Sequence, residues 1–267
     1  QRQMCIRDRA VPSPYVRGTA ELMAPYVKDE QIIVNVAKGI EEKTLMTMTD
    51  IISEEIPAAG VYVLSGPSHA EEVGRGIPTT CVISGPKRET AEYLQGIFMS
   101  PVFRVYTTPD TLGVELGGSL KNVIALAAGT ADGLGYGDNT KAALITRGIA
   151  EIARLGTKMG ARMETFYGLS GMGDLIVTCA SVHSRNRKAG YLMGKGYTMQ
   201  QAMNEVKMVV EGVYSAKAAK SLAEKYDVEM PIIMEVNKVL FEDKSAADAV
   251  RDLMVRDKKV ETPMLPW

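Results

Sequence analysis

The residues of this sequence that could do chemistry include two lysines. Lys121 is the one whose charge has the less favourable surroundings. It lies in residues 113–129, G-V-E-L-G-G-S-L-K-N-V-I-A-L-A-A-G, where six apolar residues follow Asn122. A helix that is apolar on nearly all sides is usually buried on most of its surface. Burying an ammonium without a partner is costly. Both a lysine at the base of a pocket and a lysine whose stem reaches the surface fit this pattern.

Lys38 is the second candidate, because it directly follows the near-continuous apolar run 31–37. The carboxyl ends of strands in an open parallel sheet face the ligand crevice. Gly66 and Ser68 also follow an expected strand, at a helix start whose backbone N–H groups are available to an anion. A solvated lysine in a loop, and an ordinary turn with a helix cap, explain these residues as well.

A carboxylate and a phosphate-type cluster occur further along the chain. Asp174 follows the glycine-rich run 168–173, and Ser184, Arg185 and Asn186 open a helix. Arginine beside a hydroxyl and an amide at a helix start is typical of phosphate sites. A solvated basic cap is the alternative, but a cation at a helix N-terminus opposes the helix dipole, so we favour phosphate binding. These residues together suit redox chemistry on a small phosphorylated alcohol or ketone, with a nicotinamide carrying the hydride.

The composition narrows the class of protein. Apolar residues make up 46% of the 267, charged residues 24%, and the net charge is -1, which is typical of a soluble globular protein rather than a nucleic-acid binder. No apolar run reaches membrane-spanning length. Cys5, Cys81 and Cys179 are scattered, which favours a reduced, cytoplasmic compartment. His69 and His183 have no cysteines nearby in sequence, so we predict no metal site.

The first part of the chain alternates short apolar strands with amphipathic helices, which is the α/β pattern of a doubly wound, mostly parallel sheet. We expect strands at 31–37, 61–64, 79–84 and 102–107, and helices at 18–27, 45–56, 69–72 and 89–99. After residue 112 the strand signals vanish. We expect helices at 113–129 and 139–159, and further helices starting near residues 171, 184, 198, 215, 231 and 245.

Two domains are therefore predicted: residues 1–112, part of a Rossmann-like parallel-sheet domain, and residues 113–267, an all-helical substrate domain. The Lys121 helix lies at their junction, where ligand sites are common. A sheet of this kind should begin with a strand and a G-x-G-x-x-G turn, which the sequence lacks. Residues 1–9 show neither the helical nor the strand period. We expect them to be a non-native leader, joined to an N-terminally truncated chain, and we assign them no element.

Seven segments in order resemble the bacterial NAD(P)-dependent glycerol-3-phosphate dehydrogenases. They are A-V-P-S, N-V-A-K-G-I-E, L-S-G-P-S-H-A-E-E-V, residues 113–129, G-L-S-G-M-G-D-L-I-V-T-C, S-R-N-R and V-V-E-G, and they cover almost all of the chain after residue 9. The resemblance implies reversible conversion of dihydroxyacetone phosphate to sn-glycerol 3-phosphate by hydride transfer, for glycerophospholipid synthesis. The family's N-terminal nucleotide-binding portion is absent, so we expect impaired activity, and the choice between NAD and NADP cannot be made.

The resemblance also implies roles for particular residues, with Lys121 as the general acid and base. It places at the substrate Lys38, Gly66, Ser68, Lys121, Asp174, Ser184, Arg185 and Asn186. It places at the cofactor Lys38, Ala70, Arg185, Val209 and Glu211. A lysine suits acid–base work only if burial or a neighbouring cation lowers its pKa, and Lys38 would be such a cation.

Two other functions stay open at this point. Sheet-plus-helix architecture does not fix the substrate, so a related dehydrogenase for another small acid or phosphate is one alternative. A non-catalytic phosphate-binding or dimerising module without a cofactor half is the other. A homodimer is compatible with either function, and no nucleic-acid partner is expected.

Overall fold

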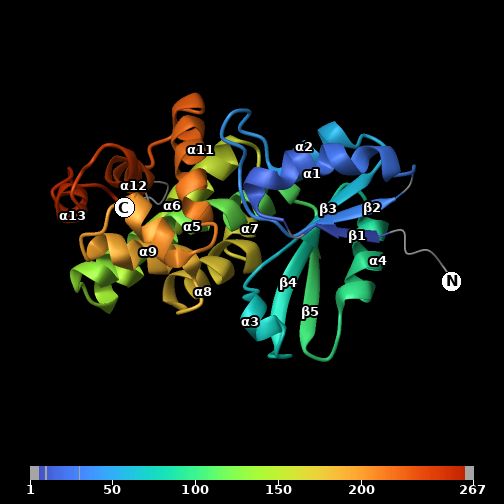
Figure 1. Ribbon diagram of the computed structural model, residues 1–267, viewed down its shortest axis with the longest axis horizontal. Helices are drawn as coiled ribbons and strands as arrows, with labels where there is room; N and C mark the ends of the chain where they lie inside the picture. The colour runs from blue at the N-terminus through green and yellow to red at the C-terminus, as the bar shows by residue number, and fades with distance from the viewer. Residues whose placement is uncertain (1–5, 10, 30, 262–267) are drawn as a thin grey trace.

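The computed structural model describes residues 6–9, 11–29 and 31–261, and it forms two parts that lie side by side (Figure 1). The first part holds a five-stranded sheet in the order β1-β2-β3-β4-β5. Its strands are β1 (Ile6–Arg9), β2 (Ile32–Asn35), β3 (Gly60–Ser65), β4 (Thr79–Ser84) and β5 (Phe103–Thr108). The second part is helical in all its regular elements among the described residues. The predicted fold class is confirmed.

The direction of the strands differs from the prediction at one place. β1, β2 and β3 run parallel to one another, and so do β4 and β5, but β3 and β4 are antiparallel, with Val63 opposite Ser84. The connection between β3 and β4 contains only the four-residue helix α3 (Ala70–Val73). A helix of that length rises about 6 Å, whereas a six-residue strand spans about 20 Å. The connection therefore lacks the usual crossover helix, and the chain turns back.

Residues 6–9, which belong to the suspected non-native leader and were left out of the expected elements, form an edge strand. The backbone of Ile6–Arg9 pairs with β2 in parallel, with Ile6 opposite Ile32. The edge of β2 would otherwise present unpaired N–H and C=O groups, and an extended segment of many sequences can satisfy them. Residues 1–5 of the predicted leader, and Ala10 of the A-V-P-S segment, lie outside the described residues.

Both faces of the sheet are covered, as the apolar strands predict. The first part contains η1 (Ser13–Tyr15), α1 (Val16–Met23), η2 (Ala24–Tyr26), α2 (Met48–Glu55), α3 and α4 (Arg88–Phe98). Ile33 of β2 packs with α1 and α2, while its neighbour Val34 packs on the opposite face with Leu94 of α4. Successive side chains of a strand point to opposite faces, so a near-continuous apolar run serves two cores.

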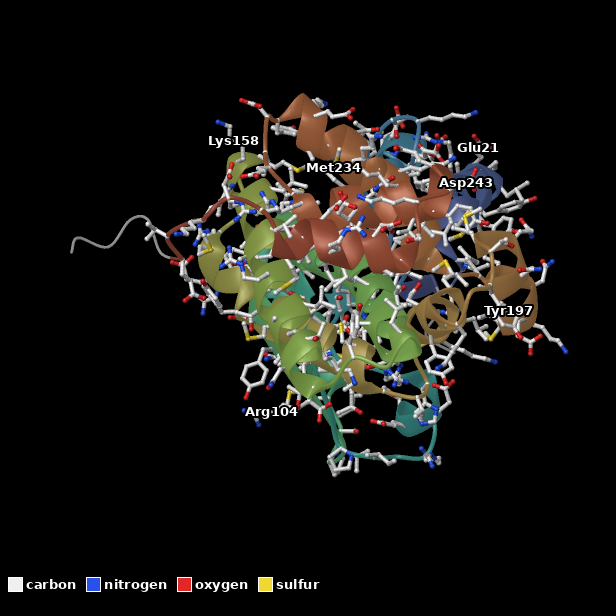
Figure 2. All side chains as sticks on the ribbon, turned by 90° about the vertical axis from the view of Figure 1, so that its left-hand side faces the viewer. Glu21, Arg104, Lys158, Tyr197, Met234 and Asp243 are labelled. Carbon is white, nitrogen blue, oxygen red and sulfur yellow. The ribbon has the colours of Figure 1, made fainter. Side chains whose placement is uncertain are left out.

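The helical part is built around α5 (Thr111–Leu134), which starts two residues before the predicted helix. The other elements are α6 (Asp138–Lys158), α7 (Met163–Phe166), the π-helical turn η3 (Leu169–Gly173), α8 (Asp174–Ala180), α9 (Arg185–Gly194), α10 (Met199–Val206), α11 (Glu211–Lys225), α12 (Pro231–Phe241) and α13 (Ala246–Met254). Lys158, Tyr197 and Asp243 lie on the outside of this part (Figure 2). Among the described residues, no helix is both long and apolar enough to span a membrane.

Three of the predicted helix starts are confirmed by their caps. The side chains of Ser184, Thr198 and Ser245 each accept a hydrogen bond from a backbone N–H of the first turn. The start predicted near Ser215 is wrong, because α11 begins at Glu211 and Ser215 is fully buried inside it. An acidic residue in the first turn suits the positive end of the helix dipole. α7 was not predicted.

Helix α5 is buried along most of its length, as its composition predicts. It packs against α9 almost backbone to backbone: a Cβ built on Gly129 would lie 2.0 Å from the carbonyl oxygen of Arg187, and one on Gly190 would lie 2.1 Å from that of Leu126. Only glycine permits so close an approach. The start of α9, with the predicted phosphate cluster, is therefore held firmly against the helix that carries Lys121.

Candidate active site

Lys121 is buried, with 6% of its surface exposed, which excludes a lysine that reaches the solvent. Its Nζ donates hydrogen bonds to Oδ1 of Asp174 and, at 2.8 Å, to Oγ1 of Thr178. Asp174 and Thr178 are one turn apart on α8, so they present their side chains on the same face of the helix. Helix α8 thus supplies both partners of the buried ammonium.

Asp174 joins Lys121 to the other predicted lysine. Its Oδ2 accepts a hydrogen bond of 2.5 Å from Nζ of Lys38, which lies in the loop after β2. Asp174 itself is only 1% exposed. A buried charge is tolerable when it is paired and hydrogen-bonded, and this carboxylate lies between two ammonium groups. The sheet, α5 and α8 therefore meet at one three-residue ion cluster.

The cluster shifts the pKa values of its members. Burial lowers the pKa of Lys121 from its ordinary 10.5 to about 8, with Lys38 acting in the same direction and Asp174 opposing. Burial alone would raise the pKa of Asp174, but Lys121 and Lys38 hold it below its ordinary value. Lys121 can therefore exist in both protonation states near neutral pH, which is the requirement for a general acid and base.

The loop after β3 contributes a backbone oxygen to this cluster. Gly66 has a φ of 141°, in the region that favours glycine, and a Cβ there would lie 3.0 Å from Cα of Cys81. Its carbonyl oxygen accepts hydrogen bonds from Nζ of Lys38 at 2.9 Å and from Oγ of Ser68 at 3.0 Å. Gly66 and Ser68 thus hold Lys38 in place, whereas the sequence suggested their N–H groups as the functional atoms.

The Ser184–Arg185–Asn186 cluster divides into two structural residues and one free cation. Ser184 caps α9 by accepting a hydrogen bond from the N–H of Arg187 at 3.1 Å. Asn186 donates to Oδ1 of Asn122 at 2.9 Å and accepts from the N–H of Gly212 at 2.8 Å. The side chain of Arg185 is half-buried and forms no hydrogen bond or ion pair with another described residue. Its guanidinium is therefore the group of this cluster that is available to a ligand.

Some of the predicted cofactor residues lie together at the junction of the two parts. Glu211 accepts hydrogen bonds from the N–H of Ser13, at 3.0 Å, and from the Ser13 hydroxyl. Burial raises the pKa of Glu211, while Ser13 and then Arg185 act in the opposite direction, so Arg185 lies within electrostatic reach. Val209 is half-buried in the loop before α11, and Ala70 is exposed at the start of α3.

Some residues of this region were missed at the level of sequence. Thr178 could have been found, because it follows Asp174 at the i,i+4 spacing of one helix face. Ser13, within the A-V-P-S segment, could have been assigned a partner only with the fold in hand, since Glu211 is 198 residues away. The same is true of Asn122 and its partner Asn186, which are 64 residues apart.

Comparisons with known proteins agree with this geometry. A family model described as the N-terminus of NAD-dependent glycerol-3-phosphate dehydrogenase matches residues 9–91, and one described as its C-terminus matches residues 110–251. The glycerol-3-phosphate dehydrogenase of Agathobacter rectalis, named with NAD(P)+, is 69% identical over 258 residues, which are 97% of this chain and 77% of that protein. Its namesake from Fusobacterium nucleatum is 66% identical over 254 residues, 94% of this chain and 76% of the relative.

A solved structure extends the likeness to three dimensions. The crystal structure of glycerol-3-phosphate dehydrogenase from Coxiella burnetii matches this chain with a TM-score of 0.91 at 35% identity, covering 94% of this chain and 77% of that one. Both family models, the curated relatives and this structure point to the same family of proteins. The chain therefore belongs to the family of NAD-dependent glycerol-3-phosphate dehydrogenases.

Proposed function

We propose that this chain interconverts dihydroxyacetone phosphate and sn-glycerol 3-phosphate with NAD or NADP, and that Lys121 is its general acid and base. The observation that carries the assignment of Lys121 is its burial in a cluster with Asp174 and Lys38, which brings its pKa to about 8. An isolated surface lysine would keep its proton throughout the physiological range. A non-catalytic phosphate-binding module would have no use for such a group.

The proton chemistry follows from this cluster. In reduction, the Lys121 ammonium donates a proton to the carbonyl oxygen of dihydroxyacetone phosphate while the carbonyl carbon becomes an alcohol carbon. In oxidation, the neutral amine accepts the hydroxyl proton. A bound nicotinamide cofactor supplies or takes up the hydride. Asp174 and Thr178 hold Nζ in place, and Lys38 adds a second positive charge beside the oxygen that becomes negative.

The phosphate group would bind at the start of α9. Arg185 has its guanidinium free of other described residues, and the first turn of a helix has N–H groups without partners in the helix. Ser184 shapes this turn, and Asn186 fixes it against Asn122, the neighbour of Lys121. Gly66 and Ser68 complete the substrate seat by orienting Lys38.

The residues present fit one end of a dinucleotide. Ser13 follows β1 and Lys38 follows β2, which is the strand edge where such ligands bind in open sheets. Glu211 and Arg185 bring an acceptor and a donor to the same region, which suits the amide-bearing end of a nicotinamide, with Val209 and Ala70 beside it. No glycine-rich turn between a strand and a helix occurs in the described part of the chain, so these residues would hold that end only.

Other features of the protein belong to the same proposal. The sheet part would correspond to residues 1–112 and the substrate domain to residues 113–267. The enzyme would act in the cytoplasm, where its product supplies the backbone of glycerophospholipids, and a homodimer is compatible with it.

The test of this function is turnover of dihydroxyacetone phosphate with NADH and with NADPH, followed by loss of absorbance of the reduced cofactor. Lys121→Met should lower kcat by about 10³-fold, the size expected for loss of a general acid. Its binding of glycerol 3-phosphate should change far less. Lys158→Met, at an exposed position at the end of α6, is the matched control. Undiminished turnover by Lys121→Met would refute the role of this lysine.

A further inference from the structure

Two histidines face each other where the two parts of the chain meet. His69 immediately precedes α3, in the sheet part, and His183 lies in the loop before α9, in the helical part. The centres of their rings are 6.1 Å apart, and the ring planes are inclined by 57°. His69 follows Ser68, and His183 precedes Ser184, so each ring is next to a residue of the proposed substrate seat. The pair connects the two segments of that seat.

The imidazole of His69 has an unsatisfied nitrogen. Its Nε2 is shielded from solvent and has no hydrogen-bond partner among the described residues. Leaving a buried polar atom without a partner is costly, and such atoms in folded proteins call for an explanation. A ligand that supplies the missing hydrogen bond is one. His69 is also within electrostatic reach of Lys121 and Asp174, so the nitrogen lies close to the reacting end of the proposed site.

The charge state of His69 points to the kind of group that it would bind. Burial lowers the pKa of His69 below its ordinary value of 6.5, and Lys121 acts in the same direction, while Asp174 opposes both. The imidazole is therefore neutral at neutral pH. A neutral ring nitrogen is a poor partner for a phosphate, which Arg185 already matches by charge, but it suits an uncharged hydroxyl, which can both donate and accept.

We propose that His69 is a further substrate-binding residue, whose Nε2 forms a hydrogen bond with the terminal hydroxyl group at the unphosphorylated end of the substrate. The inference rests on the function proposed above. In dihydroxyacetone phosphate and in glycerol 3-phosphate, the carbon that bears this hydroxyl is bonded directly to the carbon on which Lys121 acts. A group close to Lys121 and outside the phosphate seat is therefore in the right region for it. His69 would select three-carbon substrates that carry the second hydroxyl.

The test removes the hydroxyl from the ligand and the imidazole from the protein, separately and together. Dissociation constants of sn-glycerol 3-phosphate and of propane-1,2-diol phosphate, which lacks the terminal hydroxyl, are measured calorimetrically. The full chain should prefer glycerol 3-phosphate by about 10- to 100-fold, the range for one buried hydrogen bond. His69→Leu should reduce this preference to within about 3-fold, mostly by weakening the binding of glycerol 3-phosphate.

Two variants separate this contact from a structural role. His69→Gln keeps an N–H group near the position of Nε2 and should retain part of the preference. His183→Leu removes the other ring of the pair and should leave the preference intact. Equal weakening of both ligands by His69→Leu would overturn the proposal, because it would show a loss of folding or of the phosphate seat. A preference that survives in His69→Leu would overturn it as well.

Binding also distinguishes this inference from the proposed function. If the full chain does not turn over dihydroxyacetone phosphate, the two ligands can still be compared, and a preference that His69→Leu removes supports the contact. If the full chain shows no preference between them, the contact is refuted whatever the turnover. Should His69→Leu fail to fold, the nitrogen resonances of His69 decide: glycerol 3-phosphate must shift Nε2, and the deoxy ligand must shift it far less.

Discussion

Helix α5 and its neighbours bury two carboxylic acids whose surroundings shift their pKa values in opposite directions. Asp174, on α8, lies between Lys121 and Lys38, which hold its pKa below the ordinary value against the effect of burial. Glu115, on α5 itself, is bonded to neutral groups, the N–H and the hydroxyl of Thr49 and the side chain of Thr47, and burial raises its pKa to about 7. Burial is nearly equal, with 1% of Asp174 and 5% of Glu115 exposed. The groups that each carboxyl contacts, and not its degree of burial, therefore decide whether it is ionised.

The opposite pKa shifts of Asp174 and Glu115 distinguish a functional cluster from other buried polar groups. Glu115 links the start of α2 to α5, and a protonated carboxyl does this as well as an ionised one. The Asp174 cluster instead holds two buried charges and the half-buried charge of Lys38, and the protonation of Lys121 can change near neutral pH. Keeping charge buried is costly and is typical of sites that use it. The following predictions test this difference between the Asp174 cluster and Glu115.

Asp174→Asn should have the largest effect. It leaves the buried ammonium of Lys121 and the half-buried one of Lys38 without their shared anion and frees Nζ of Lys121, so kcat should fall by about 10²- to 10³-fold. Since Asp174 raises the pKa of Lys121, its loss should also move the alkaline rise of glycerol 3-phosphate oxidation to lower pH. The pH dependence of kcat measures both effects.

The control for this variant is Asp132→Asn. Asp132 also lies between two cations, Arg187 and Lys141, but near the surface and away from Lys121. Its variant should keep the pH profile of the unaltered chain. A profile that moves equally in both variants would mean that general electrostatics, and not the cluster, sets the pKa of Lys121.

Glu115→Gln should change stability and its dependence on pH. The pKa of Glu115 is about 7 in the folded chain and near its ordinary 4.5 when unfolded, so the folded state holds the proton more tightly. The free energy of unfolding should therefore fall as pH rises from 4.5 to 7, by about 3 kcal/mol from this residue. Glutamine, which cannot ionise, should remove that fall in urea denaturation.

Glu151 serves as an internal comparison for Glu115. It accepts hydrogen bonds from the N–H groups of Ile232 and Ile233 at the start of α12, and burial raises its pKa to about 7 as well. Glu151→Gln should remove a similar part of the slope, and the double variant should remove both parts. A slope that survives in the double variant would contradict the assignment.

Lys38→Gln should act on Lys121 in the direction opposite to Asp174→Asn. Lys38 lowers the pKa of Lys121, so its removal should move the alkaline rise of oxidation to higher pH. We also expect kcat/KM to fall by about 10-fold, because a charge-assisted contact is lost. Steady-state rates across pH, with the exposed Lys158→Gln as control, test this. A shift of both site variants in one direction would refute the opposed roles of Asp174 and Lys38.

Thr178→Val should have the smallest effect. It keeps the shape of the side chain but removes the hydroxyl that accepts from Nζ of Lys121, and kcat should fall by about 3- to 10-fold. Thr157→Val is the matched control. Both hydroxyls donate a hydrogen bond to the backbone carbonyl four residues earlier, but Thr157 lies on α6, outside the site. Equal loss in the two variants would assign Thr178 a purely structural role.

The sequence predicted the fold class and the elements better than their directions. Burial of α5 followed from its composition, and Ser184, Thr198 and Ser245 marked helix starts because caps are local. The reversal of β4 and the position of α11 depend on how distant segments pack, which no local pattern encodes. Residues 6–9 form a strand because β2 offers an edge, and their own pattern gave no sign of it.

The sequence identified several residues of the candidate site but not the contacts between them. Lys121 was singled out by an apolar helix, and Lys38 by its place after a buried strand. That they share one carboxylate 53 residues from Lys121 and 136 from Lys38 emerges only in three dimensions. The unsatisfied nitrogen of His69 is likewise invisible in sequence, because a histidine beside a turn is unremarkable until its surroundings are known.

The close packing of α5 against α9 has a consequence for which molecules the site can accept. Gly129, Gly133, Gly190 and Gly194 bring the two backbones into contact, so the helices cannot slide or separate without breaking that fit. Lys121 belongs to one of them and Arg185 to the other. The distance between the backbone positions of Lys121, the proposed proton donor, and Arg185, the proposed phosphate anchor, is therefore set by contacts between the two main chains. If the proposed roles hold, this fixed distance should disfavour phosphorylated ketones that are longer or shorter than the three-carbon substrate.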